Sequence, residues 1–351
     1  MSKVSKVKES RNSFNLEDAF KCVFFLLIAV SIATVVYTVV LMAIAEGQGM
    51  DFTDFYITPE VQIVTIAFSP IFFLVFFYLY CAKNKINTKL ALADSIKKSL
   101  LPVSVAIVLS IICIFLITPF ASMLEHLFTM LGFVYDDTIP YIMYMRISPL
   151  HLLIGILILG VLTAVAEEYI FRGLVLRGLH SKFDAVSSIL VSSLLFTLAH
   201  GSAAQTVYQM IMGIILGYLA LVGGSILYSI ILHCLNNTLV ILLNVYNGID
   251  YLNASTQVYE NVWQFVFPVL LFLLAVSLIG VLFWVLKFLR NKHYFVKPTK
   301  AELQKESEVE EKMSILDFWK YSIANEKVYM IACLAFGFIM WLINTFSGYT
   351  G

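Results

Sequence analysis

Three charged residues lie inside an otherwise apolar stretch of the chain: Glu167, Glu168 and Arg172. A charge at bilayer depth costs about 2.5–3.5 kcal/mol on insertion scales, so these three predict either a substrate or ion site or a structural ion pair. At about 100° per residue, Glu168 and Arg172 lie on one helix face, in the order that favours pairing. Glu167 points about 100° away without a local partner and is the candidate general base.

Two histidines and an asparagine supply further polar groups in the longest uncharged run, residues 185–249. His200 ends an FxxxH pattern, and His233 and Asn237 share one face of another helix. These side chains and Glu167 come from different helices, so they can meet only in the interior of a bundle. Together they could activate a water molecule and stabilise an oxyanion.

Each of these groups also has a structural explanation when taken alone. His200 can bond a helix carbonyl, and His233 and Asn237 can hold two helices together through bonds of about 0.6–2 kcal/mol. Asn236 is interpreted as an incidental polar neighbour. A single catalytic site explains the histidines, Asn237 and the acidic pair together.

The composition is that of a membrane protein. Of 351 residues, 60% are hydrophobic and 13% charged, whereas soluble domains contain about 25% charged residues. Glycine-rich breaks at 201–203 and 223–225 divide the run 185–249 into three short helices. Other uncharged runs are long enough to cross about 30 Å of hydrocarbon: 23–45, 61–82, 99–124, 147–166, 261–286 and 328–351. The pattern predicts an all-α fold, a polytopic membrane helix bundle of about eight to nine transmembrane helices.

The connections between these runs differ in charge. Basic residues precede the first run and follow the second, fourth and eighth predicted spans, whereas the loops 46–60, 125–137 and 247–260 are acidic or neutral. By the positive-inside rule, the N-terminus is cytoplasmic and the protein is a multi-pass protein of the cell membrane. The first run is too long for a signal-peptide core of about 7–15 residues and predicts a retained helix. The net charge of zero gives no argument for a nucleic-acid partner.

Three motifs in this order resemble those of the CAAX protease and bacteriocin-processing (CPBP/Abi) family of intramembrane endopeptidases, which is related to the type II CAAX prenyl proteases. The motifs are EExxxR (Glu167, Glu168, Arg172), FxxxH (Phe196, His200) and HxxxN (His233, Asn237). The resemblance covers about residues 141–246. It implies a catalytic core there, preceded by N-terminal transmembrane helices in 1–140. C-terminal transmembrane helices would follow in 247–351, with a charged cytoplasmic linker at 300–312 that is expected to be helical.

The resemblance also implies roles for individual residues. Glu167 and His200 would activate the attacking water, and His233 and Asn237 would hold the oxyanion. Glu168 and Arg172 would be structural or supporting. The chain contains no HExxH motif and its five cysteines are interpreted as small buried hydrophobes. We therefore expect no required metal, although a divalent ion such as zinc remains an alternative.

The leading hypothesis is an intramembrane endopeptidase acting on a membrane-associated, lipidated or secreted peptide or protein. The composition favours a peptide or membrane-protein substrate over a prenylated one, and the family includes proteins linked to bacteriocin maturation and self-immunity. Two alternatives remain open. A non-catalytic membrane scaffold or immunity protein would use the helices for binding alone. A proton-coupled transporter would use Glu167 and the histidines as a relay and predicts internal repeats, which the chain lacks.

Helix depth poses a difficulty for the predicted site. If every helix spans the membrane fully, Glu167 and His200 lie near opposite faces, more than about 20 Å apart at 1.5 Å per residue. We predict that the helix starting near Tyr141 or Ile147 continues past Arg172, which places the glutamates deep. A short or tilted helix over 185–200 is the alternative. A separate short interfacial helix is predicted over 121–133.

Overall fold

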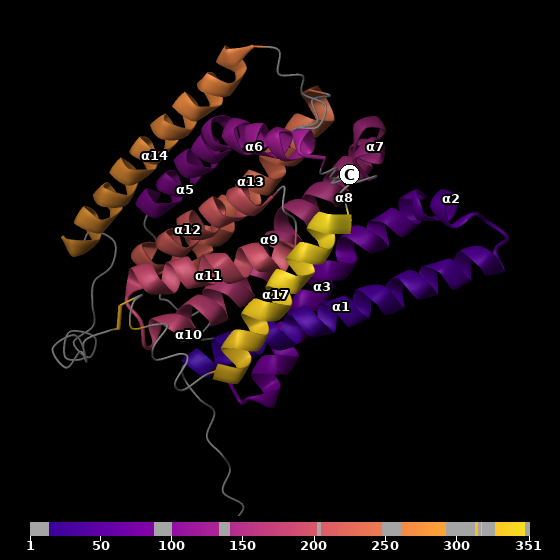
Figure 1. Cartoon of the computed structure of the whole chain (residues 1–351), viewed down its shortest axis with the longest axis horizontal. Coiled ribbons are helices and arrows are strands. Elements are labelled where there is room, and N and C mark those ends of the chain that lie inside the picture. Colours follow the sequence, from indigo (N-terminus) through magenta and orange to yellow (C-terminus); the bar gives the residue numbers. More distant parts are fainter. Residues whose placement is uncertain are drawn as a thin grey trace, which may run out of the picture.

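The computed structural model describes residues 14–87, 100–132, 141–201, 205–247, 261–292, 313–314, 317 and 327–347. Most of these residues form helices and turns, and Phe183 and Met313 form an isolated parallel bridge. The α-helices and π-helices (η) are α1 (Leu16–Gly47), α2 (Phe52–Tyr56), α3 (Pro59–Lys83), α5 (Leu100–Ile112), η1 (Cys113–Ile117), α6 (Thr118–Met130), α7 (Tyr141–Ile147), α8 (Pro149–Gly155), η2 (Ile156–Leu162), α9 (Thr163–Glu168), η3 (Tyr169–Val175), α10 (Leu176–His180), α11 (Ala185–His200), α12 (Thr206–Gly223), α13 (Ile226–Asn247), α14 (Val262–Asn291) and α17 (Lys327–Ser347). Figure 1 shows them packed as a bundle.

The predicted fold class is confirmed. Within the described residues, 7 helical runs are long and apolar enough to cross a membrane, and two shorter apolar helices cover Ala185–His200 and Val328–Ile343. The predicted glycine breaks are also present, since α11 ends at Gly201 (φ 61°) and α12 ends at Gly224 (φ 78°). Left-handed backbone of this kind favours glycine, so the helices turn where the sequence allows it. The predicted linker 300–312 lies outside the described residues.

The helix that carries the glutamates is unbroken over Pro149–His180, as predicted. Two π segments interrupt its α-helical geometry, η2 before the glutamates and η3 directly after them. A π turn holds more residues than an α turn and rotates the following side chains about the axis, and such turns often occur at functional sites. Both segments therefore affect where Glu167 and Glu168 point.

The prediction of a separate interfacial helix over 121–133 is wrong. The helix instead runs on from α5 through η1 into α6 over Leu100–Met130. Pro119 lacks a backbone N–H and would clash with the preceding turn of an ordinary helix. The wider π segment η1 accommodates it, and Thr118 Oγ1 donates to the Cys113 carbonyl oxygen at 3.2 Å. The helix can continue because of this local widening.

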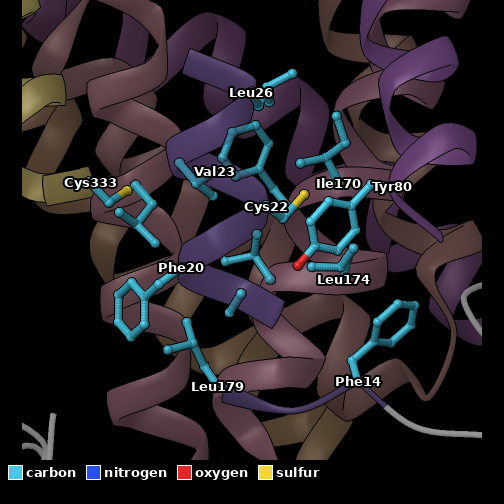
Figure 2. Packing of buried hydrophobic residues seen from close by; sticks show 14 of the residues in the cluster. Phe14, Phe20, Cys22, Val23, Leu26, Tyr80, Ile170, Leu174, Leu179 and Cys333 are labelled. Atoms are coloured by element: carbon cyan, nitrogen blue, oxygen red, sulfur yellow. The ribbon is translucent and has the colours of Figure 1, made fainter. Parts of the chain in front are cut away.

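The two ends of the described chain pack together around the glutamate-bearing helix. Helix α1 contacts η3, α10 and α17, and α17 also contacts α11 (Figure 1). In the apolar cluster between them, Val23 of α1 lies near Cys333 of α17 (Figure 2). On the other side of α1, Cys22 lies toward Tyr80 and Ile170. The first and last helices thus support the core from outside it. Four of the five cysteines are buried, as expected of small hydrophobes, and Cys234 is half-buried.

Candidate active site

The deepest part of the site is a buried ion pair. Arg172 Nη1 lies 2.7 Å from Glu168 Oε1, and the two side chains are 1% and 0% exposed. The guanidinium also donates to the Gly213 carbonyl oxygen at 3.4 Å and lies 4.4 Å from the centre of the Phe196 ring. The predicted pairing of Glu168 with Arg172 is confirmed, and Phe196 supplies a cation–π contact.

His233 lies between the two carboxylates. Its Nδ1 is 3.0 Å from Glu168 Oε1, and its Nε2 is 3.7 Å from Glu167 Oε2. The contact with Glu168 joins residues 65 positions apart, so no local pattern predicts it. Glu168 orients the imidazole, and the other ring nitrogen is left on the Glu167 side.

His200 reaches the same level of the bundle because α11 is short. It lies 15 residues after Ala185, and Glu167 lies 13 residues before His180, so both are about 20 Å from the turn that joins their helices. The Phe196 carbonyl oxygen lies 2.9 Å from His200 Nδ1 and accepts a hydrogen bond from it in the tautomer that leaves Nε2 as an acceptor. The predicted depth conflict is resolved by the long helix and the short α11 together.

Asn237 stands one helical turn beyond His233 on α13. Its Nδ2 donates to the Leu159 carbonyl oxygen of η2 at 3.2 Å. A side-chain amide carries two N–H bonds, so this contact fixes the amide plane and uses one of them. The second N–H is not used by this contact.

One cavity of about 350 Å³ joins the four predicted catalytic residues. Glu167, His200, His233 and Asn237 all line it. Glu167 is 14% exposed, and its Oε2 has no hydrogen-bond partner within the described residues. The structure therefore brings the four side chains together, with Glu168 and Arg172 behind them. A cavity of this size holds about ten water molecules or a short segment of a ligand.

Residues 149–239 match the family described as Type II CAAX prenyl endopeptidase Rce1-like. The matched segment is about a quarter of the chain. All three motifs fall within it, and the match supports an intramembrane CAAX endopeptidase in general terms. Comparisons with curated proteins and with solved structures gave no match.

The cavity also contains residues that sequence reasoning missed. Asn236 was interpreted as incidental, but its side chain is 4% exposed, lines the cavity and accepts from Tyr208 Oη at 2.8 Å. Outside the Rce1-like segment, η1 and α6 supply one wall. Thr118, Ser122 and Glu125 contribute to this wall. Their spacing along the helix places them on one face. This spacing is the one feature of the sequence that could have identified them.

The donor set of the Rce1-like site does not fit a zinc centre. No three His, Cys, Asp or Glu side chains of the described residues form a group that could hold a metal ion. Protein zinc sites use three or four such ligands at about 2.0–2.3 Å.

Proposed function

We propose that the protein is an endopeptidase of the cell membrane that hydrolyses a peptide bond of a membrane-associated, lipidated or secreted substrate without a required metal. The N-terminus would be cytoplasmic. One observation carries the proposal: four residues of the Rce1-like segment, Glu167, His200, His233 and Asn237, line one cavity.

The reaction begins with a water molecule beside Glu167. Its carboxylate accepts a proton while the water oxygen forms a bond to the substrate carbonyl carbon. His200 Nε2, the nitrogen not engaged with Phe196, accepts a hydrogen bond from the same water. The proton then passes to the substrate nitrogen as the C–N bond breaks. The products are a carboxylic acid and an amine, so atoms and electrons balance.

The oxyanion of the tetrahedral intermediate would be held by the second Asn237 N–H and by His233 Nε2–H. Because His233 Nδ1 faces Glu168, donation from Nε2 requires a proton on both ring nitrogens. Glu168 is then a positioning residue, which Arg172 holds in place. Donors fixed before the reaction stabilise developing charge without reorganisation.

The proposal is tested in membranes of cells that express the wild type, Glu167→Gln, His200→Ala or Glu60→Gln. The last is the matched control, because Glu60 is exposed at the start of α3. New peptide termini are identified by mass spectrometry. We expect the same termini with the wild type and the control, and a loss of about 10²–10⁴-fold with Glu167→Gln.

Equal amounts of every terminus with Glu167→Gln and the wild type, at equal expression, would overturn the peptidase proposal. A role as a non-catalytic scaffold or immunity protein would then be favoured if the variant still protects cells or binds a partner. A proton-coupled transporter would instead show substrate uptake that depends on Glu167.

A further inference from the structure

Along the glutamate-bearing helix and α13, the cavity extends from the candidate catalytic groups toward one end of the bundle. On the glutamate-bearing helix its lining residues are Leu159, Thr163 and Glu167, which lead back toward Pro149. On α13 the lining continues from His233 to Asn244, toward the end of that helix. These helices are antiparallel, because His233 contacts Glu168 whereas Asn237, further along α13, contacts Leu159, which precedes Glu168. Both directions therefore lead toward the same end of the bundle. At 1.5 Å per residue, the lining covers about 12 Å from Glu167 to Leu159 and about 16 Å from His233 to Asn244.

That end of the bundle is acidic. It carries α2 and α7 (Figure 1). Tyr144 Oη of α7 donates a hydrogen bond to the carbonyl oxygen of Ile57, directly after α2, at 2.6 Å. The α1–α3 connection at this end contains Glu46, Asp51, Asp54 and Glu60, and Arg146 is the one basic residue near it in the described chain. Glu125 of α6 lines the cavity.

The opposite end is basic. There, the start of α1 packs against α10, and Tyr80 near the end of α3 reaches the start of α1 through its hydroxyl, 3.4 Å from the Asp18 carbonyl oxygen. The described lysines and arginines near this end outnumber the acidic residues Glu17, Asp18, Asp184 and Asp317. They are Lys21, Lys83, Lys85, Arg177, Lys182, Lys287, Arg290 and Lys292. By the positive-inside rule this end faces the cytoplasm. The cavity then lies on the far side of the catalytic groups from the cytoplasm.

We propose that the cavity receives its peptide from the non-cytoplasmic side of the membrane, and that the peptide segment bound beside Glu125 is neutral or basic. The inference rests on the proposed function for calling the ligand a peptide. Among the described residues, two carboxylates and no lysine or arginine line the cavity. Clefts lined by one sign of charge concentrate ligands of the other sign. The substrate class is therefore a secreted peptide or an outward-facing segment of a membrane protein, rather than a cytoplasmic chain end.

The test uses single cysteines in a Cys234→Ser background, since the other four native cysteines are buried. Ala121→Cys reports on the cavity wall, Glu60→Cys on the acidic end and Lys182→Cys on the basic end. Intact cells and inverted vesicles are treated with membrane-impermeant methanethiosulfonates of similar size, one cationic and one anionic. Each labelling rate is divided by the rate at which the same reagent reacts with a small soluble thiol.

We expect Ala121→Cys and Glu60→Cys to react in intact cells, and Lys182→Cys to react only in inverted vesicles. At Ala121→Cys the normalised rate should be about tenfold higher for the cationic reagent. Reaction of Ala121→Cys only in inverted vesicles, or in neither preparation, would overturn the sidedness. Equal normalised rates would overturn the charge preference. Labelling needs no catalysis, so repeating it with Glu167→Gln separates failure of this inference from failure of the peptidase proposal.

Discussion

The two sides of the glutamate-bearing helix differ in how completely they are filled. Toward α1 and α3, Ile170, Phe171 and Leu174 are each 0% exposed and belong to one apolar cluster. Toward α6 and α13, Thr163 and Glu167 border the cavity. Adjacent residues also differ, since Glu168 is fully buried between Arg172 and His233 whereas Glu167 borders the cavity. The packed half holds groups in place, and the hollow half leaves room for water and substrate.

This contrast predicts two kinds of variant. Changes in the packed half should lower the free energy of unfolding, because close-packed interiors tolerate little change in volume or charge. Changes in the hollow half should lower processing with little effect on stability. The difference between the halves would be contradicted by packed-half variants that lower only processing, or by hollow-half variants that lower only stability.

The largest effect is expected from Arg172→Met. It leaves the Glu168 carboxylate buried without its guanidinium, and breaking a buried pair costs about 3–5 kcal/mol. The measurement is unfolding in detergent. The double variant Glu168→Gln with Arg172→Met removes both charges and should recover part of the loss. Unchanged stability of the single variant would show that the ion pair does not stabilise the fold.

Asn237→Ala should reduce the processing rate about 10²–10³-fold, as expected for loss of one oxyanion donor. Its stability should change by less than about 1 kcal/mol, since one hydrogen bond to Leu159 is lost. Asn15→Ala is the opposite case. Asn15 caps α1 in the packed half, so its loss should cost about 0.5–2 kcal/mol in stability and leave processing intact. Equal processing by both variants would contradict the assignment of Asn237.

Gly213→Ala should destabilise the protein by about 1–3 kcal/mol through overpacking. A Cβ at this position would lie 2.8 Å from Ser193 Cβ and 3.0 Å from Ser193 Cα, so α11 and α12 would have to separate. The Gly213 carbonyl oxygen also accepts a hydrogen bond from Arg172 Nη2. Gly280→Ala is the control, because a Cβ there meets nothing within 4 Å. Thermal unfolding in detergent compares the two, and equal midpoints would show that the α11–α12 contact is loose.

Tyr208→Phe should have the smallest effect, about 1 kcal/mol in stability. It removes the hydroxyl that donates to Asn236 at 2.8 Å, and cavity water can replace that donor. Denaturant unfolding measures the loss. A loss above about 3 kcal/mol would show that this wall belongs to the packed half.

Local features of the site and fold were predictable from the sequence. The Glu168–Arg172 pair follows from i,i+4 spacing on one helix, because helical geometry alone brings these side chains together. The membrane spans follow from the length of the apolar runs, and the breaks at Gly201 and Gly224 follow from backbone that favours glycine. Spacing also identified Glu167 as a residue without a local partner.

Only the tertiary structure decided how the helices meet. It placed His233 between two carboxylates, set Phe196 against Arg172 and made η1 and α6 a wall of the cavity. These contacts depend on the depth and rotation of each helix, which π segments change and hydrophobicity does not record. In an apolar bundle many rotations bury similar surface, so packing between distant residues selects the one that forms the site.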